Sequence, residues 1–213
     1  MQIRTGIKQS ALLVIDAQKS FMAGPRWRRR NNPQFEENVL RLINGYRLKN
    51  LPVIFFLDSD DTEYFEPSSP YFKLMDFIRP EKAEPVLVKT SRNCFTTTNL
   101  DYLLRRADVR RVVVTGIKTE QCCETTTRVA SDLGYEVDFV TEATLTFPIP
   151  HPDLDEELSA EEVVRRTEYA LRDRFARINT VAALLKELDV KTATDDRRPE
   201  TGASGHPSPV AGL

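Results

Sequence analysis

The chain has 213 residues, with 30 Lys and Arg against 32 Asp and Glu, which gives a formal net charge of -2. This length suits a single domain with one sizeable core, and the balanced charge argues against nucleic acid or an anionic membrane as the partner. Hydrophobic residues make up 40% and charged residues 29% of the chain, a profile typical of globular proteins. The longest apolar runs, residues 11–15 and 51–57, are much shorter than a membrane span.

The N-terminus lacks the charged start, apolar run and small-residue cleavage site of a secretory signal. The chain contains three cysteines, two of them adjacent at positions 122 and 123, which is a poor basis for a disulfide framework. We therefore expect free thiols in a reducing compartment, a cytoplasmic location and no contact with a membrane.

Five short apolar runs predict β-strands in chain order. Most are continuous rather than alternating, which is typical of strands buried on both faces of a parallel sheet. The runs cover residues 11–15, 53–57, 86–88, 112–115 and 137–141. Apolar residues at helical spacing predict helices between them, over residues 38–49, 99–107 and 119–133. Gly134 then predicts a left-handed cap that ends the third helix.

After Phe147 a Pro-rich stretch predicts a break with no regular structure, followed by a helix over about residues 160–178 and a short helix capped by Asn179 and Thr180. Polar residues, Gly and Pro dominate afterwards, so we expect a domain at 1–190 and a disordered tail at 191–213. Alternating strands and helices with right-handed crossovers indicate an α/β fold. We expect a three-layer α/β/α Rossmann-like fold with a mainly parallel sheet of five or six strands.

Three residues with chemical potential lie at the ends of predicted strands. Asp16 follows the first strand, Lys89 the third, and Cys122 the fourth after a short turn. Each alone is ordinary, because Asp in such a place is usually a turn residue or helix cap and Lys usually reaches solvent. However, ligands of an open parallel sheet bind outside the carboxyl ends of its strands. The combination therefore predicts one shared site.

Cys122 is expected in the first turn of a helix. Free backbone N–H groups and the helix dipole stabilise a thiolate there, and the ammonium of Lys89 would add to the effect. We therefore predict a nucleophilic thiolate at Cys122. The alternative is a buried structural thiol. That alternative fits Cys123 better, because the next residue on a helix points about 100° away, and we also interpret Cys94 as structural.

Taken together, residues 13–21, 89–100 and 114–126 resemble the three signature segments of the isochorismatase-like cysteine hydrolases. With residues 134–143 and the late segment at 175–178, the resemblance covers roughly residues 8–188. It implies that Cys122 is the nucleophile on a carbonyl carbon, that Asp16 accepts and donates the proton, and that Lys89 holds both by its charge.

The resemblance also implies a cis peptide bond between Ile117 and Lys118. The backbone N–H groups of Lys118 and Cys122 would then point to one place and form an oxyanion hole. A lysine at position 118 departs from the small or apolar residues that are frequent in similar sequences. We expect its side chain to point to solvent.

Nicotinamidases of the same superfamily hold a metal through Asp and His residues after the second strand. Here residues 55–64 contain no His, and the only histidines of the chain are His151 and His206. The stretch instead holds four acidic residues: Asp58, Asp60, Asp61 and Glu63. These leave open a Mg²⁺ or Ca²⁺ site made of oxygens alone, but a solvated acidic loop is the simpler interpretation. We therefore expect no metal and no cofactor.

The candidate substrate contacts are Phe21, Trp27, Arg92 and Phe95. Trp27 lies in a loop after the Asp16 strand, and aromatic side chains near a pocket mouth commonly stack on or cover a ligand. The same loop carries an arginine cluster between positions 26 and 30, which is either a solvated loop or a clamp for an anionic substrate. Residues 64–71, rich in Tyr, Phe and Pro, are a possible pocket wall or an oligomer contact.

Three functions remain open from the sequence. The first is a metal-independent cysteine hydrolase that cleaves a C–N bond of a small amide, ureide or lactam through a thioester on Cys122. The second is an isochorismatase-type vinyl ether hydrolase, for which Asp16 and Lys89 suffice. The third is a catalytically silent binding protein of the same fold. We favour the first because Cys122 is present, and we expect a small-molecule substrate and a homo-oligomer, either a dimer or a tetramer.

Overall fold

The computed structural model describes residues 6–189, so the tail expected at 191–213 lies outside the described residues. A six-stranded sheet runs through the centre in the order β3-β2-β1-β4-β5-β8, and every neighbouring pair is parallel. Its strands are β1 (Ser10–Ile15), β2 (Val53–Asp58), β3 (Val86–Lys89), β4 (Arg111–Ile117), β5 (Glu136–Leu145) and β8 (Arg177–Ile178). The predicted parallel sheet is therefore confirmed.

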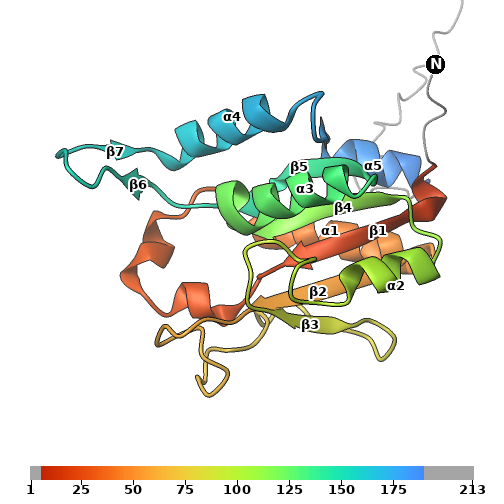
Figure 1. The fold of residues 1–213 in the computed structure, drawn as a ribbon, viewed down its shortest axis with the longest axis horizontal. Coiled ribbons are helices and arrows are strands. Elements are labelled where there is room, and N and C mark those ends of the chain that lie inside the picture. The colour runs from red at the N-terminus through yellow and green to blue at the C-terminus, as the bar shows by residue number, and fades with distance from the viewer. Residues whose placement is uncertain (1–5, 190–213) are drawn as a thin grey trace, which may run out of the picture.

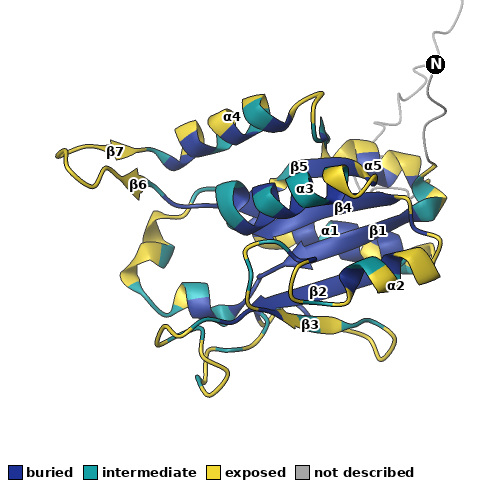
Figure 2. Cartoon of the chain, in the orientation of Figure 1, coloured by how far each residue is buried: buried dark blue, intermediate teal, exposed yellow. Residues whose placement is uncertain are grey.

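Helices cover both faces of this sheet (Figure 1). They are α1 (Phe35–Leu48), α2 (Leu100–Arg106), α3 (Glu124–Asp132), α4 (Ala160–Leu171) and α5 (Val181–Glu187). Leu12 and Val14 of β1 pack in one core with α1 and α5, whereas Leu13 and Ile15 pack in a second core with α2, α3 and α4. Successive side chains of a strand point to opposite faces, so the continuous apolar run of β1 supplies both cores. Figure 2 shows the resulting buried sheet between helices with exposed outer faces, which confirms the three layers.

β3 is the edge strand of the sheet and departs from the expectation of burial on both faces. Val86 and Val88 are exposed, and Lys89 is its only buried residue. An edge strand has a neighbour on one side only, so its side chains are covered only in part. The strand nevertheless carries the Lys89 side chain into the protein at its carboxyl end.

Two predictions for the C-terminal part are corrected. The helix expected to reach residue 178 ends at Leu171, because Arg172 leaves the helical conformation with a ψ of 129° and Asp173 follows with a positive φ of 61°. The chain then forms the two-residue strand β8, which pairs with β5. The Pro-rich break contains a short antiparallel pair, β6 (Ile149–Pro150) and β7 (Glu157–Leu158), which projects from the body in Figure 1.

The caps predicted at Thr180 and Gly134 are confirmed, whereas Asn179 precedes the cap of α5. The Thr180 side chain accepts a hydrogen bond from the N–H of Ala183 and so begins α5, and Gly134 has a φ of 89° after α3. No helix within residues 6–189 is long and apolar enough to cross a membrane.

Gly116 brings the carboxyl ends of β1 and β4 close together. Its φ is 126°, and a Cβ at this position would lie 1.9 Å from the backbone oxygen of Ile15. Gly134 also has a positive φ, but a Cβ there would meet nothing within 4 Å. A side chain at Gly134 would therefore meet backbone strain alone, whereas one at Gly116 would meet both strain and steric overlap.

We expect Gly116→Ala to lower the free energy of unfolding by about 3 kcal/mol or more, because overlap with a buried backbone adds to strain. Gly134→Ala should cost only about 1–2 kcal/mol, the strain alone. Urea denaturation of both variants measures the difference. Equal losses would contradict the close approach of the two strands.

Candidate active site

The site lies at the carboxyl ends of four adjacent strands. Asp16 follows β1, Asp58 ends β2, Lys89 ends β3, and Cys122 follows β4 in the π-helical turn Thr119–Cys123 that leads into α3. The strands are neighbours in the order β3-β2-β1-β4. Because β1 pairs with β2 on one side and β4 on the other, the site lies where the winding of the sheet reverses, which is where α/β sheets bind ligands.

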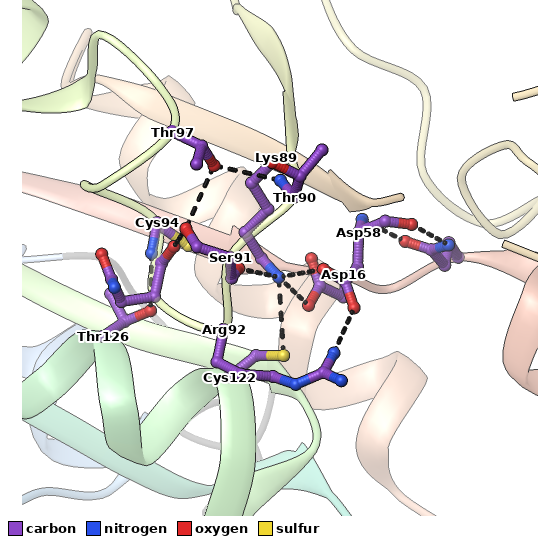
Figure 3. A network of polar contacts seen from close by, with 12 residues as sticks. Asp16, Asp58, Lys89, Thr90, Ser91, Arg92, Cys94, Thr97, Cys122 and Thr126 are labelled. Atoms are coloured by element: carbon purple, nitrogen blue, oxygen red, sulfur yellow. Dashed lines mark hydrogen bonds and ion pairs between the residues drawn. The ribbon is translucent and has the colours of Figure 1, made fainter. Parts of the chain in front are cut away.

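The ammonium of Lys89 lies at the centre of this group (Figure 3). Its Nζ is 2.7 Å from Oδ1 of Asp58, 2.9 Å from Oδ2 of Asp16 and 3.5 Å from Sγ of Cys122. It also donates a hydrogen bond of 3.2 Å to the carbonyl of Ser91. Buried charges need such partners. The structure therefore brings together the three residues that the sequence placed at strand ends.

Lys89 remains a cation in this position. Burial alone would lower the pKa of its ammonium, but the negative charges around it, with Asp16 the strongest and Asp58 contributing, raise that pKa above its ordinary value. The positive charge is thus permanent at neutral pH, and it is shared between a carboxylate next to the thiol and a carboxylate further along the sheet.

The interpretation of Asp58 as part of a solvated acidic loop is wrong. The residue is only 4% exposed and contacts both Lys89 and the Nη1 atom of Arg92, which lies 3.2 Å from its Oδ2. Gln18 fixes its backbone, because Oε1 accepts the N–H of Asp58 at 2.7 Å and Nε2 donates to its carbonyl at 3.1 Å. A signal was available, since Asp58 directly follows an apolar run as Asp16 and Lys89 do.

Asp16 is completely buried and has a positive φ of 49°. No well-aligned hydrogen-bond donor reaches either carboxylate oxygen, although Lys89 lies within ion-pair distance. Burial raises the pKa of Asp16 to about 6; the charge of Lys89 opposes this rise and the charge of Asp58 adds to it. A carboxylate with such a pKa is ionised at neutral pH and is a stronger base than an exposed one.

The expectation of a resting thiolate at Cys122 is corrected. Burial and the negative charge of Asp16 raise the pKa of Cys122 well above its ordinary value, against the lowering effect of Lys89. The sulfur therefore rests as a thiol. The lysine and the helix end favour a thiolate, but burial and the neighbouring carboxylate outweigh them. A thiolate here would need a base to take its proton, and the carboxylate of Asp16 lies within 4.8 Å of the sulfur.

The peptide bond between Ile117 and Lys118 is cis, as the resemblance implied. The carbonyl of Lys118 accepts hydrogen bonds of 3.2 Å from the N–H groups of Gln121 and Cys123. Its side chain does not simply point to solvent, because it lines the cavity beside Cys122, and burial lowers the pKa of its ammonium. The expectation for this side chain is thus corrected.

That cavity has a volume of about 320 Å³. Its lining residues are Ser20, Phe21, Gly24, Arg26, Asp58, Asp60, Tyr64, Phe65, Arg92, Lys118, Gln121 and Cys122. Its size lies at the lower end of ordinary ligand pockets. Two of the candidate substrate contacts, Phe21 and Arg92, are part of its wall, and so is the beginning of the aromatic segment at residues 64–71.

The other two candidate contacts are placed elsewhere. Trp27 packs against Phe147, with ring centroids 6.4 Å apart, and is not among the lining residues. Phe95 is buried in the second core and stacks on Tyr135 at 6.0 Å. An aromatic residue near a motif can pack in the core or contact a ligand, and the sequence does not distinguish these two roles.

A larger hollow of about 690 Å³ lies along β5 and β8. Its buried charges pair with one another, because Asp138 binds both Arg111 and Arg177. Its lining contains no cysteine or histidine. These ion pairs fasten β8 to the sheet and leave no reactive group in the hollow comparable to Cys122.

The donor atoms of Asp16, Asp58 and Cys122 lie within 4.8 Å of one another, close enough to share a metal ion. However, the ammonium of Lys89 contacts all three, so a metal ion would face a buried like charge at short range. Asp60 does not join them, because its Oδ1 accepts a hydrogen bond from the N–H of Thr62. This donor set does not fit a resident metal.

We expect the charge of Asp58 to influence the pKa of Asp16. The charge of Asp58 raises the pKa of Asp16. If Asp16 is the base of a reaction at this site, Asp58→Asn should therefore move the acidic limb of kcat/KM below pH 6. Loss of this partner of Lys89 should also reduce kcat by up to roughly 100-fold. A pH profile of the variant measures both effects, with the exposed Asp61→Asn as control. A limb that stays in place would contradict the coupling between the two carboxylates.

Comparisons with known proteins agree with this architecture. A family model for the isochorismatase domain matches residues 10–163. The isochorismatase family protein YrdC of Bacillus subtilis is 30% identical over 187 residues, which are 87% of this chain and 98% of YrdC. Nicotinamidase 3 of Arabidopsis thaliana is 30% identical over 157 residues, covering 66% of this chain and 75% of that protein.

Solved structures support the same assignment. A crystal structure of an isochorismatase family protein from Chromobacterium violaceum superimposes with a TM-score of 0.81 at 28% identity, covering 88% of this chain and 97% of the other. The fold and the strand-end site are those of an α/β protein with its ligand site at the switch point of the sheet. The chain therefore belongs to the isochorismatase family of hydrolases.

Proposed function

We propose that this protein is a metal-independent cysteine hydrolase that cleaves a C–N bond of a small amide, ureide or lactam through a thioester on Cys122. One observation carries the proposal. The thiol of Cys122 and the carboxylate of Asp16 meet at one buried ammonium, that of Lys89, and the thiol borders a cavity large enough for a small ligand.

The acylation step uses the thiol and the buried carboxylate. As Sγ of Cys122 attacks the carbonyl carbon, Asp16 takes the thiol proton, and the ammonium of Lys89 offsets the charge that moves between them. The proton then passes from Asp16 to the departing nitrogen while the C–N bond breaks. The products are a free amine or ammonia and a thioester on Cys122.

The deacylation step reuses the same groups. Asp16 is again ionised and takes a proton from a water molecule that attacks the thioester, which releases the acid and restores the thiol. In both steps, the N–H groups of Lys118 and Cys122 would hold the developing oxyanion, for about 3 kcal/mol per donor in comparable sites. Splitting the hydrolysis in this way lowers both barriers.

Two observations support this proposal over a non-catalytic role. The pKa of Asp16, about 6, suits a general base that works near neutral pH. Nicotinamidase 3, one of the relatives, is named for the hydrolysis of an amide. Neither observation identifies the acyl group, so the proposal specifies the type of bond that is cleaved and not the substrate.

The test screens small amides, ureides and lactams for released ammonia or amine. The enzyme is then quenched in acid during turnover and mapped by mass spectrometry. We expect an acyl adduct on Cys122, absent from Cys94 and Cys123. Turnover without any adduct, under conditions in which deacylation is rate-limiting, would contradict the thioester route. A panel without turnover, together with iodoacetamide labelling of Cys122 no faster than of the other two, would indicate a silent binding protein.

A further inference from the structure

Three cationic side chains converge on the cavity beside Cys122. Arg26 comes from the 3₁₀ turn Pro25–Arg29, Arg92 from the loop after β3, and Lys118 from the end of β4. Their charges act on one another, because Arg26 and Arg92 both add to the lowering of the pKa of Lys118 that burial causes. Segments far apart in the sequence therefore concentrate positive charge on one small volume.

Only one of these cations is neutralised by a close partner. Arg92 is 3.2 Å from Asp58, so the two cations Lys89 and Arg92 balance the two carboxylates Asp16 and Asp58. Among the residues that the structure describes, neither Arg26 nor Lys118 has a carboxylate within 4.0 Å. Two positive charges at the cavity are thus left without an ion-pair partner.

The acidic residues nearby form no ion pair with these two cations. Asp60 lines the cavity, but its Oδ1 accepts hydrogen bonds from the backbone and hydroxyl of Thr62. Glu120 acts on the pKa of Lys118 from a distance, while its Oε2 accepts the hydroxyl of Thr146. Both carboxylates keep their negative charge near the cavity, but their hydrogen bonds go to neutral groups, and neither carboxylate lies within 4.0 Å of Arg26 or Lys118.

The arginines between positions 26 and 30 make different contacts. Arg29 forms an ion pair with Glu157 of the β6–β7 hairpin, and Arg30 donates to the carbonyl of Trp27 and lies 4.4 Å from the centroid of its ring. Arg26 differs, because its guanidinium lies 5.8 Å from the ring centroid of Phe147 and borders the cavity. Of these three arginines, only Arg26 is therefore placed beside the cavity.

The remaining wall is aromatic. Phe21 and Phe65 meet edge to face at 5.0 Å, and both line the cavity. An aromatic wall displaces water and strengthens the attraction between a ligand anion and the cations opposite. A neutral ligand of the same size would leave Arg26 and Lys118 facing no partner.

We propose that the substrate is a small amide, ureide or lactam that carries a carboxylate, bound by Arg26 and Lys118 with Arg92 beside them, while the scissile carbonyl meets Cys122. The inference rests on the proposed function for the scissile bond and adds the class of substrate. Arg26 and Lys118 determine specificity. A guanidinium binds a carboxylate through two parallel hydrogen bonds, which also orients the ligand.

The test compares two thiol reagents of nearly equal size, iodoacetate and iodoacetamide, of which only the first carries a carboxylate. In both reactions Sγ of Cys122 forms a bond to the methylene carbon, iodide leaves, and the thiol proton is lost. The rate ratio of iodoacetate to iodoacetamide is measured at Cys122 by peptide mass spectrometry in the native protein and in the chain unfolded in urea.

We expect this ratio to be at least about tenfold higher in the native protein than in the unfolded chain, as charge-assisted hydrogen bonds to the carboxylate imply. The ratio should fall towards the unfolded value in the double variant Arg26→Gln, Lys118→Met. Arg28→Gln removes the same charge from an exposed position in the same turn, and it should keep the native ratio. Circular dichroism verifies that each variant is folded.

Two results separate the possible failures. If Cys122 reacts with both reagents but its ratio matches that of the unfolded chain, or is the same in the double variant, the carboxylate inference is overturned and the proposed function stands. If native Cys122 reacts with neither reagent, the nucleophile itself is absent, and the proposed function falls together with this inference.

Discussion

Cys122→Ala is expected to reduce kcat on an amide substrate by roughly 10⁴-fold or more, because the thioester cannot form without Sγ. The cavity and its cations remain, so substrate should still bind. Steady-state kinetics on any amide found in the screen measures the loss. Cys123→Ala is a matched control, since this neighbouring sulfur is fully buried in the second core. It should change stability more than turnover.

The same variant separates the two catalytic hypotheses. Hydrolysis of a vinyl ether needs a proton donor and a charge but no sulfur nucleophile, so Asp16 and Lys89 would suffice. If Cys122→Ala keeps most of the activity on a vinyl ether substrate, and amides are not hydrolysed by the wild type, the isochorismatase-type reaction is the better description. A comparable loss of activity on amide and vinyl ether substrates would show that both reactions need the sulfur of Cys122.

The acidic limb of kcat/KM is expected near pH 6 rather than near pH 4. Asp16 must be ionised to accept the thiol proton, and burial raises its pKa to about 6. Activity should therefore rise as the pH increases through this value. Asp16→Asn removes the base, and we expect a loss of roughly 10²–10⁴-fold together with disappearance of the limb. Initial rates between pH 4 and pH 8 provide the measurement.

Asp61→Asn controls for a general change of charge, because Asp61 is exposed on the loop after β2. It should leave the limb near pH 6. A limb near pH 4 in the wild type, or one that survives in Asp16→Asn, would show that another group governs the reaction and that the carboxylate beside Cys122 is not the proton acceptor.

The sheet was predictable because its strands are buried on both faces. Continuous apolar runs such as residues 11–15 and 112–115 are typical of central parallel strands when helical segments lie between them in the chain. The strands that escaped prediction within residues 6–189 are two residues long, namely β6, β7 and β8. A strand of two residues has no periodicity, and it forms only because a neighbour is already in place to pair with it.

The site was predictable to the level of its strand ends. Asp16, Lys89 and Cys122 follow from their positions after apolar runs, but the role of Asp58 depends on partners 31 and 34 residues away. Its position among other acidic residues favoured a solvated loop. Likewise, the protonated state of Cys122 depends on how deeply Asp16 is buried, which is a property of the folded protein and not of a motif.

Trp27 is the only tryptophan of the chain. It belongs to the same 3₁₀ turn as Arg26, packs against Phe147 and lies under the guanidinium of Arg30. All indole fluorescence of the protein therefore comes from one short segment that borders the cavity beside Cys122. A ligand that moves this segment should change the fluorescence of Trp27, so binding can be titrated without an attached dye.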